Sequence, residues 1–272
     1  MPSEPAEASI PRARARAREV VRVGAALARR GRMVRVALGI AAITVLGALV
    51  LALKLAVHGE AAPLGELCAM SAAALAWGAG VLIAFAASAQ ALRRDRTSGV
   101  RALLRARGAS SVAYIGGRVG GLALLLAIVV GGGTLIVGLA GILLASRIGA
   151  AGRVLQATIA SLAYSLAFAA TLGPLAMAAL GARSRAGGYV WLLVLLVLPE
   201  MLMPWTGDAL PAPWREVASV PTALGAFRGA LMPPGIDWGR FVRAAFVLAL
   251  VAAACVALVR RDMIRVDAED LG

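Results

Sequence analysis

The side chains able to carry out chemistry are few in this chain of 272 residues. It contains one histidine, His58, and two cysteines, Cys68 and Cys255, which both lie in apolar runs and are expected to pack as small buried residues. Metal sites gather several His, Cys or carboxylate ligands at short spacing, and no such cluster occurs. The motifs GxxxxGKS or GxxxxGKT, GxSxG and GxGxxG are also missing from the sequence. We therefore predict no catalytic, cofactor-binding or metal site, and no ATP hydrolysis by the chain itself.

The composition predicts an integral membrane protein. Hydrophobic residues make up 61% of the chain and its mean hydropathy is +0.85, whereas soluble domains are about half apolar. Lysine and arginine number 28 against 14 acidic residues, so the formal net charge is +14. In so apolar a chain we interpret the basic residues as determinants of topology that meet anionic lipid, and we expect no nucleic-acid partner.

Six segments are long and apolar enough, or nearly so, to cross a bilayer as helices, which takes about 20 residues each. The sequence therefore predicts an all-α integral membrane fold. Residues 1–13 are expected to form a disordered cytoplasmic tail, and 14–272 a single transmembrane domain. The expected spans are 33–57, 67–90, 112–145, 154–180, 187–204 and 241–259.

The distribution of basic residues predicts the orientation. With six spans both termini share one side, and that side then carries 21 of the 28 basic residues. Because basic residues are retained in the cytoplasm, both termini are predicted to be cytoplasmic. Of the seven on the other side, Arg147 and Arg153 fit this orientation least well, since they flank a short loop.

The end of the N-terminal tail has the pattern of a basic amphipathic helix. Arg14, Arg18 and Arg22 recur every four residues, while Val20 and Leu27 can share another face. Such a helix can lie along the membrane at headgroup level. The alternative is a basic tail that sets topology without defined packing.

Two further features concern the spans. Gly117 and Gly121 stand four residues apart, a spacing that lets helices approach closely.

Glu200 lies near the outer end of the fifth expected span, where an ionisable group is either a candidate gate of a transport pathway or a hydrated interfacial residue. The segment 205–240 is too polar and proline-rich to span, so it predicts short outer interfacial or re-entrant helices between spans five and six.

The loop between spans two and three predicts a short capped helix. Ser98 can cap a helix that begins at Gly99, and Val100, Leu103 and Leu104 then form an apolar stripe. A second face carries basic residues, which near the last turn are also favoured by the helix dipole. These are Arg101, Arg105 and Arg107.

This helix is too short to be stable alone, so its apolar stripe must be buried on something. One possibility is the ends of its own spans, and the other is a partner protein. A third interpretation is a loop that only marks the cytoplasmic side and happens to be helical.

The pattern from Arg96 to Arg118 resembles the loop after the second span of ABC-2 type transporter permeases. In these permeases a charged pair comes first, followed by a conserved glycine and then two leucines. A turn of small residues with a serine follows, and a glycine with a basic residue then opens the third span. The six expected spans, the N-terminal helix and the outer segment extend the resemblance over nearly the whole chain. The family loop often has glutamates before the glycine, whereas this chain has Arg93-Arg94-Asp95-Arg96. The residues in step are Gly99, Leu103, Leu104, Ser110, Tyr114, Gly117 and Arg118.

The resemblance implies a transport subunit of the bacterial cytoplasmic membrane, with export as the favoured direction. It implies a second permease chain, identical or related, and two copies of a separate ABC ATPase that binds ATP and Mg. The helix from Gly99 to Arg107 would dock on that ATPase. Leucines would fill a groove there, and arginines would provide charge complementarity. The implied coupling residues are Gly99, Val100, Arg101, Leu103, Leu104, Arg105 and Arg107.

Two other functions fit the same composition. A membrane scaffold or assembly protein would need no ATPase, and its basic loop would only set topology and lipid contacts. A secondary carrier is less favoured because such proteins place charged residues at mid-membrane, and apart from Lys54 and Glu200 the spans have almost none.

Overall fold

A computed structural model describes residues 9–59, 62–106, 110–146, 151–181, 185–206 and 211–268. Within these residues all regular structure is helical, and no strand occurs. The all-α membrane fold predicted from the composition is therefore confirmed at the level of secondary structure. The expected disordered tail, 1–13, lies largely outside the described residues, apart from the start of helix α1 (Ser9–Arg29).

In the part of the chain that the structure describes, five helical segments are long and apolar enough to cross a membrane. Two of them contain a π-helical stretch near the middle, η2 (Leu75–Gly80) and η3 (Ala127–Gly131). The segments agree with the first four expected spans and with the last. They are α2 (Arg32–Val57); α3 (Ala62–Ala74), η2, α4 (Val81–Ser88) and α5 (Ala91–Thr97) together; α7 (Ser111–Leu126), η3 and α8 (Gly132–Ser146) together; α9 (Ala151–Leu180); and α14 (Trp238–Ala268).

The expected fifth span, 187–204, is not one continuous helix of spanning length. It forms α10 (Arg185–Leu196) and α11 (Leu198–Thr206), which meet at Val197. Pro199 explains the break, because proline has no N–H to donate to the carbonyl four residues earlier. The apolar stretch that runs through this junction, Gly187–Met203, is shorter than each of the five spanning segments. A sixth crossing therefore stays a prediction.

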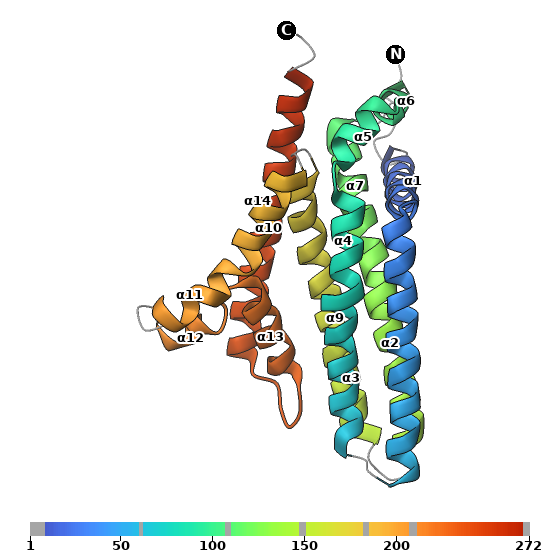
Figure 1. Ribbon diagram of the computed structural model, residues 1–272, viewed down its shortest axis with the longest axis vertical. Helices are drawn as coiled ribbons and strands as arrows, with labels where there is room; N and C mark the ends of the chain where they lie inside the picture. The colour runs from blue at the N-terminus through green and yellow to red at the C-terminus, as the bar shows by residue number, and fades with distance from the viewer. Residues whose placement is uncertain are drawn as a thin grey trace.

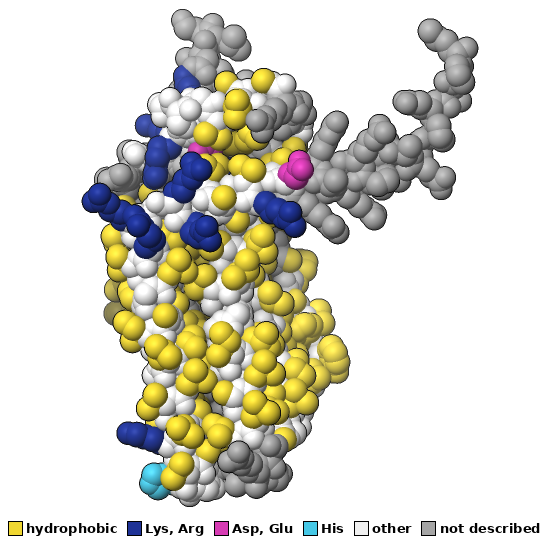
Figure 2. Space-filling model, turned by 90° about the vertical axis from the view of Figure 1, so that its right-hand side faces the viewer, with side chains coloured by type: hydrophobic (Ala, Val, Ile, Leu, Met, Phe, Trp, Pro, Cys, Tyr) yellow, Lys and Arg dark blue, Asp and Glu magenta, His cyan; other side chains and the backbone are white. Residues whose placement is uncertain are grey.

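Figure 1 shows how the chain nevertheless returns to its starting end. α10 leaves the end where α9 finishes and leans away from the bundle toward α11 and α12 (Ala212–Arg215). α13 (Val220–Leu231) continues toward the opposite end, and α14 runs back. The start of α2, α5, α6 (Val100–Ala106) and the end of α14 thus share one end of the molecule. Most of the basic side chains visible in Figure 2 gather at this end, above a long apolar surface.

Helix α9 is the centre of the bundle. Of its most apolar window 67% is buried, against 22% for α2 and for α14, and it contacts α3, α7, α8, α13 and α14. Its Phe168 is fully buried and packs edge-on against Trp77 of η2, with ring centroids 5.6 Å apart. The second and third spans are therefore assembled around α9, and their basic ends meet above it.

Helix α1 packs directly on α7 through glycines. A Cβ at Gly117 would lie 2.9 Å from the carbonyl oxygen of Val20, and one at Gly121 would lie 2.5 Å from the backbone nitrogen of Ala25. Gly24 faces Gly117 equally closely. Small residues are required where two backbones approach so nearly. A helix, α1, is present where one was expected, and it packs on α7, whereas its place at the membrane surface stays a prediction. Figure 1 shows α1 almost end-on, so it lies across the direction of α2.

The glycine contact gives a paired test with adjacent residues. Gly117→Ala should lower the stability by about 1–3 kcal/mol, because the added methyl group overpacks the α1–α7 crossing. Gly116→Ala is the control, since nothing lies within 4 Å of a Cβ at Gly116. It should be neutral or slightly stabilising, as alanine favours helices over glycine by about 1 kcal/mol. Thermal unfolding in detergent measures both variants, and equal melting temperatures would contradict the close packing.

Candidate functional site

The loop between the second and third spans is a hairpin of two short helices, α5 and α6. A helix is present where one was predicted, as α6, but it begins at Val100 and a further helix, α5, precedes it, so Ser98 is not its N-cap. The N–H of Ser98 donates instead to the carbonyl of Arg94 at 2.9 Å, which closes α5. Gly99 has a φ of +72°, a conformation that glycine adopts without strain, and so turns the chain before α6 begins at Val100.

The base of the hairpin is bonded to the end of α9. The N–H of Gln90 donates to the carbonyl of Leu180 at 2.9 Å, and that of Leu92 donates to Gly181 at 3.1 Å. The last carbonyls of a helix have no partner within it, so these bonds satisfy two groups that would otherwise be buried without one. The start of α5 is thereby fixed to the central helix.

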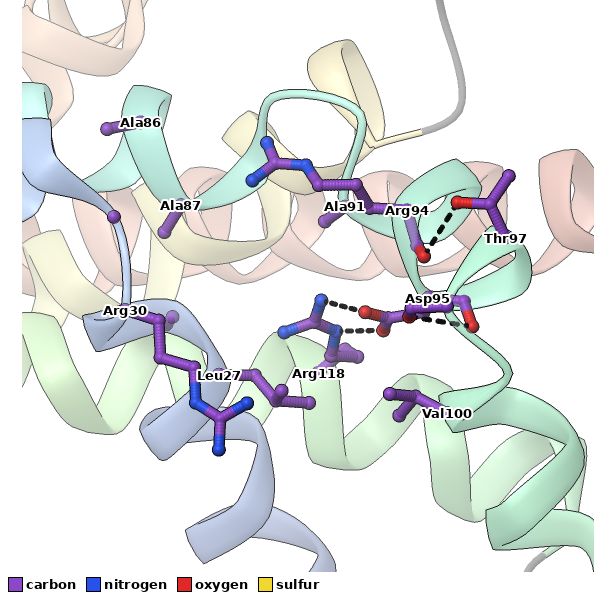
Figure 3. Close-up of a pocket in the computed structure, with 13 residues that line it drawn as sticks. Leu27, Arg30, Ala86, Ala87, Ala91, Arg94, Asp95, Thr97, Val100 and Arg118 are labelled. Carbon is purple, nitrogen blue, oxygen red and sulfur yellow. Dashed lines mark hydrogen bonds and ion pairs between the residues drawn. The ribbon is translucent and has the colours of Figure 1, made fainter.

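A buried ion pair fixes the other end of α5 to α7. The two oxygens of Asp95 each lie 2.6 Å from a guanidinium nitrogen of Arg118, and the Tyr114 hydroxyl donates to the same carboxylate at 2.7 Å (Figure 3). The side chains of Arg118 and Asp95 are only 9% and 5% exposed. Tyr114 and Arg118 are four residues apart and so share one face of α7. Buried charges persist only when paired in this way.

Asp95 is the residue of this site that the sequence analysis did not single out. It stands among Arg93, Arg94 and Arg96, a pattern that predicts a charged, solvent-exposed surface. One signal could have found it: Asp95 is the only acidic residue between Glu66 and Glu200. An isolated acid beside an apolar span is a candidate for a buried partner.

The predicted coupling residues of α6 do not share one face. Leu103 is exposed, at 56%, whereas Leu104 and Val100 are half-buried, and Leu104 packs against the core. Arg101 is buried, with its guanidinium 6.0 Å from the centre of the Tyr114 ring, and so departs from the outward basic face that was expected.

The remaining coupling residues are only partly placed. Arg105 belongs to α6, but its side chain lies outside the described part of the structure, as does all of Arg107. Ser110, one of the residues in step with the family pattern, caps α7, since its hydroxyl accepts a hydrogen bond from the N–H of Ala113 at 3.1 Å. The apolar stripe is thus divided between the chain's own spans and the surface.

Glu200 lies well away from this hairpin, on α11. Its carboxylate accepts a hydrogen bond from the Ser219 hydroxyl, which also accepts from the N–H of Thr222 at 3.1 Å and so caps α13. Glu200 is half-buried and joins α11 to the start of α13. Whether it also contacts a transported molecule stays a prediction.

Besides Asp95, another charged residue with buried contacts that was not predicted is Arg228 of α13. It donates to the carbonyl of Ala69 in α3 at 2.8 Å, and its guanidinium lies 5.3 Å from the centre of the Tyr164 ring in α9. These contacts hold α13 on the bundle. Part of the outer segment between α11 and α14 is therefore packed protein and not only an interfacial helix.

The two cysteines are free and buried, as predicted, and no three His, Cys, Asp or Glu side chains of the described residues gather as a metal site requires. No protein-family model matches the sequence, and no curated protein matches it.

The ion pair predicts a specific loss of stability. Asp95→Asn leaves the Arg118 charge buried and uncompensated, which costs about 3–5 kcal/mol in buried pairs. The melting temperature in detergent should fall, and Asp95→Asn combined with Arg118→Met should recover part of the loss because no buried charge then remains. Asp262→Asn on the half-buried surface of α14 is the control. A melting temperature for Asp95→Asn equal to that of the control would refute the role given to the pair.

Proposed function

We propose that this chain is the permease subunit of an ABC transporter whose ATPase is a separate protein. The observation that carries the proposal is the α5–α6 hairpin at the basic end, which is anchored to two spans and presents exposed Leu103. The resemblance of residues 96–118 to the corresponding loop of ABC-2 permeases supports it. In such a system two ATPase copies, with ATP and Mg bound in them, act on two permease chains.

The anchors explain how the hairpin would transmit movement. Force on α6 reaches α5 through the turn at Gly99, and α5 is tied to α7 by the Asp95–Arg118 pair and to α9 by backbone hydrogen bonds. Breaking a buried pair from one side is costly, so α5 and the basic end of α7 would move together. A rigid element with two stable positions is what couples distant sites in a transporter.

The docking surface would combine an apolar contact with positive charge. Leu103 would enter an apolar groove of the ATPase, and exposed Arg93 would face acidic residues at its rim. Arg101 and Leu104 would act from beneath, because they hold α6 against the chain's own Tyr114 and core.

The membrane arrangement that we propose has six crossings and both termini in the cytoplasm of a bacterium. The fifth crossing would be divided between α10–α11 and α13, which together lead from the basic end toward the other end (Figure 1). α1 would lie along the cytoplasmic headgroups. Substrate export is the direction that the family resemblance favours.

A scaffold or assembly protein without an ATPase is the main alternative, and a secondary carrier is the next. The carrier is disfavoured by the scarcity of ionisable groups in the spans. Purification of the tagged full-length protein from its native membranes in mild detergent separates the other two. A bound P-loop ATPase that hydrolyses ATP supports the permease, whereas purification without one supports the scaffold.

The docking surface predicts different results for neighbouring leucines. Leu103→Asp should weaken ATPase binding by about tenfold or more, because an anchor residue of an interface is lost, while leaving the melting temperature unchanged. Leu104→Asp should lower the melting temperature, since Leu104 packs on the core. The control is Ile264→Asp, which changes an equally exposed aliphatic residue on the part of α14 that lies at the basic end of the molecule. This variant should retain ATPase binding. Unchanged ATPase affinity in Leu103→Asp would argue against docking through α6.

A further inference from the structure

A cavity of about 620 Å³ lies at the basic end, between the α1–α2 junction, α5, α6 and α7 (Figure 3). Its volume is within the range of sites that hold small ligands. One part of the wall is apolar and another part is basic, which suits a molecule with both kinds of surface. The side chains that define these parts are Leu27, Ala87 and Val100, and Arg30, Arg94 and Arg118.

The charge of the cavity is not balanced by its own walls. Asp95 is the only acidic residue among the described residues that line it, and both of its oxygens are occupied by Arg118. The charges of Arg30 and Arg94 therefore remain uncompensated by any acidic group of the lining. Figure 3 shows these two arginines on opposite sides of the cavity, with Arg118 between them.

The Arg94 side chain is fixed by a backbone carbonyl, and Arg30 is placed at the cavity by the turn between α1 and α2. The Arg94 guanidinium donates to the carbonyl of Ala89, which keeps its side chain along α5 and over the cavity. Arg30 stands in the turn between α1 and α2, where its N–H donates to the carbonyl of Leu27 at 3.4 Å. Guanidinium groups bind phosphate oxygens through paired hydrogen bonds, so the two arginines are suited to a phosphate between them.

The surroundings of the cavity favour a lipid as the source of that phosphate. Leu82 lies one turn from Ala86 of the lining and is 37% exposed, and Met33, two residues after Gly31 of the lining, is 59% exposed. Apolar surface thus continues from the cavity along α4 and α2, where acyl chains could lie. Basic pockets between helices on the cytoplasmic side are known to bind anionic headgroups.

We propose that this cavity binds the phosphate headgroup of an anionic phospholipid from the cytoplasmic leaflet. Arg30 and Arg94 hold the phosphate, and the apolar wall receives the glycerol backbone and the first methylene groups. The bound lipid joins α1 and α2 to α5, and so stabilises the hairpin against the spans. The proposal needs only the membrane-embedded chain and does not depend on an ATPase partner.

The test uses the full-length protein in detergent, titrated with phosphatidylglycerol, with phosphatidylcholine or with inorganic phosphate. Bound lipid is counted by native mass spectrometry, and the melting temperature is followed in parallel. The site variant is Arg30→Gln with Arg94→Gln. The matched control is Arg260→Gln with Arg261→Gln. It removes the same amount of charge from two exposed arginines on α14, at the same end of the molecule as the cavity.

Phosphatidylglycerol should bind and raise the melting temperature of the wild-type protein more than phosphatidylcholine does. The site variant should bind phosphatidylglycerol about thirtyfold more weakly, as expected for the loss of two basic contacts, while the control keeps nearly full affinity. Equal effects of the two lipids, or equal losses in the two variants, would overturn the proposal. Stabilisation by inorganic phosphate as strong as that by phosphatidylglycerol would also overturn it, and would assign the site to free phosphate.

Discussion

The pair of charges formed by Asp95 and Arg118 is the interaction on which the basic end of this molecule depends. α5 and α6 have seven residues each, too few to be stable helices in isolation. They are held because one carboxylate, buried beside the third span, meets a guanidinium and a phenol from α7. Loss of either charge would leave the other buried and unpaired, so the pair ties α5 to α7.

The same helix, α7, organises two neighbours with two of its faces. Tyr114 and Arg118 face α5, while Gly117 and Gly121, also four residues apart, admit α1 at very short distance. The ion pair and the tyrosine hydrogen bond attach α5 to α7, and the glycines let α1 pack closely against it. The cavity at the basic end exists because α1 and the hairpin approach α7 from these two directions and leave space between them.

Apolar length, a local property of the chain, predicts five of the six expected spans. The fifth expected span, 187–204, has the composition but not the continuity, because Pro199 interrupts its hydrogen bonds. In the loop, Ser98 ends α5 and does not start the next helix, and Gly99 turns the chain in a left-handed conformation before α6. Serine and glycine are suited both to a helix start and to a turn between helices, and the anchoring of α5 decides between the two.

The sequence by itself determined that this is a helical membrane protein, and it predicted the end at which its arginines gather, because hydropathy and charge can be read along the chain. Only the tertiary structure decided which charged groups turn inward. Asp95 and Arg101 look like surface residues in a basic loop, but partners 19 and 23 residues after Asp95 draw its carboxylate into the interior, and Arg101 lies over the Tyr114 ring. Burial of a charge depends on partners that the fold brings together, and no local pattern specifies them.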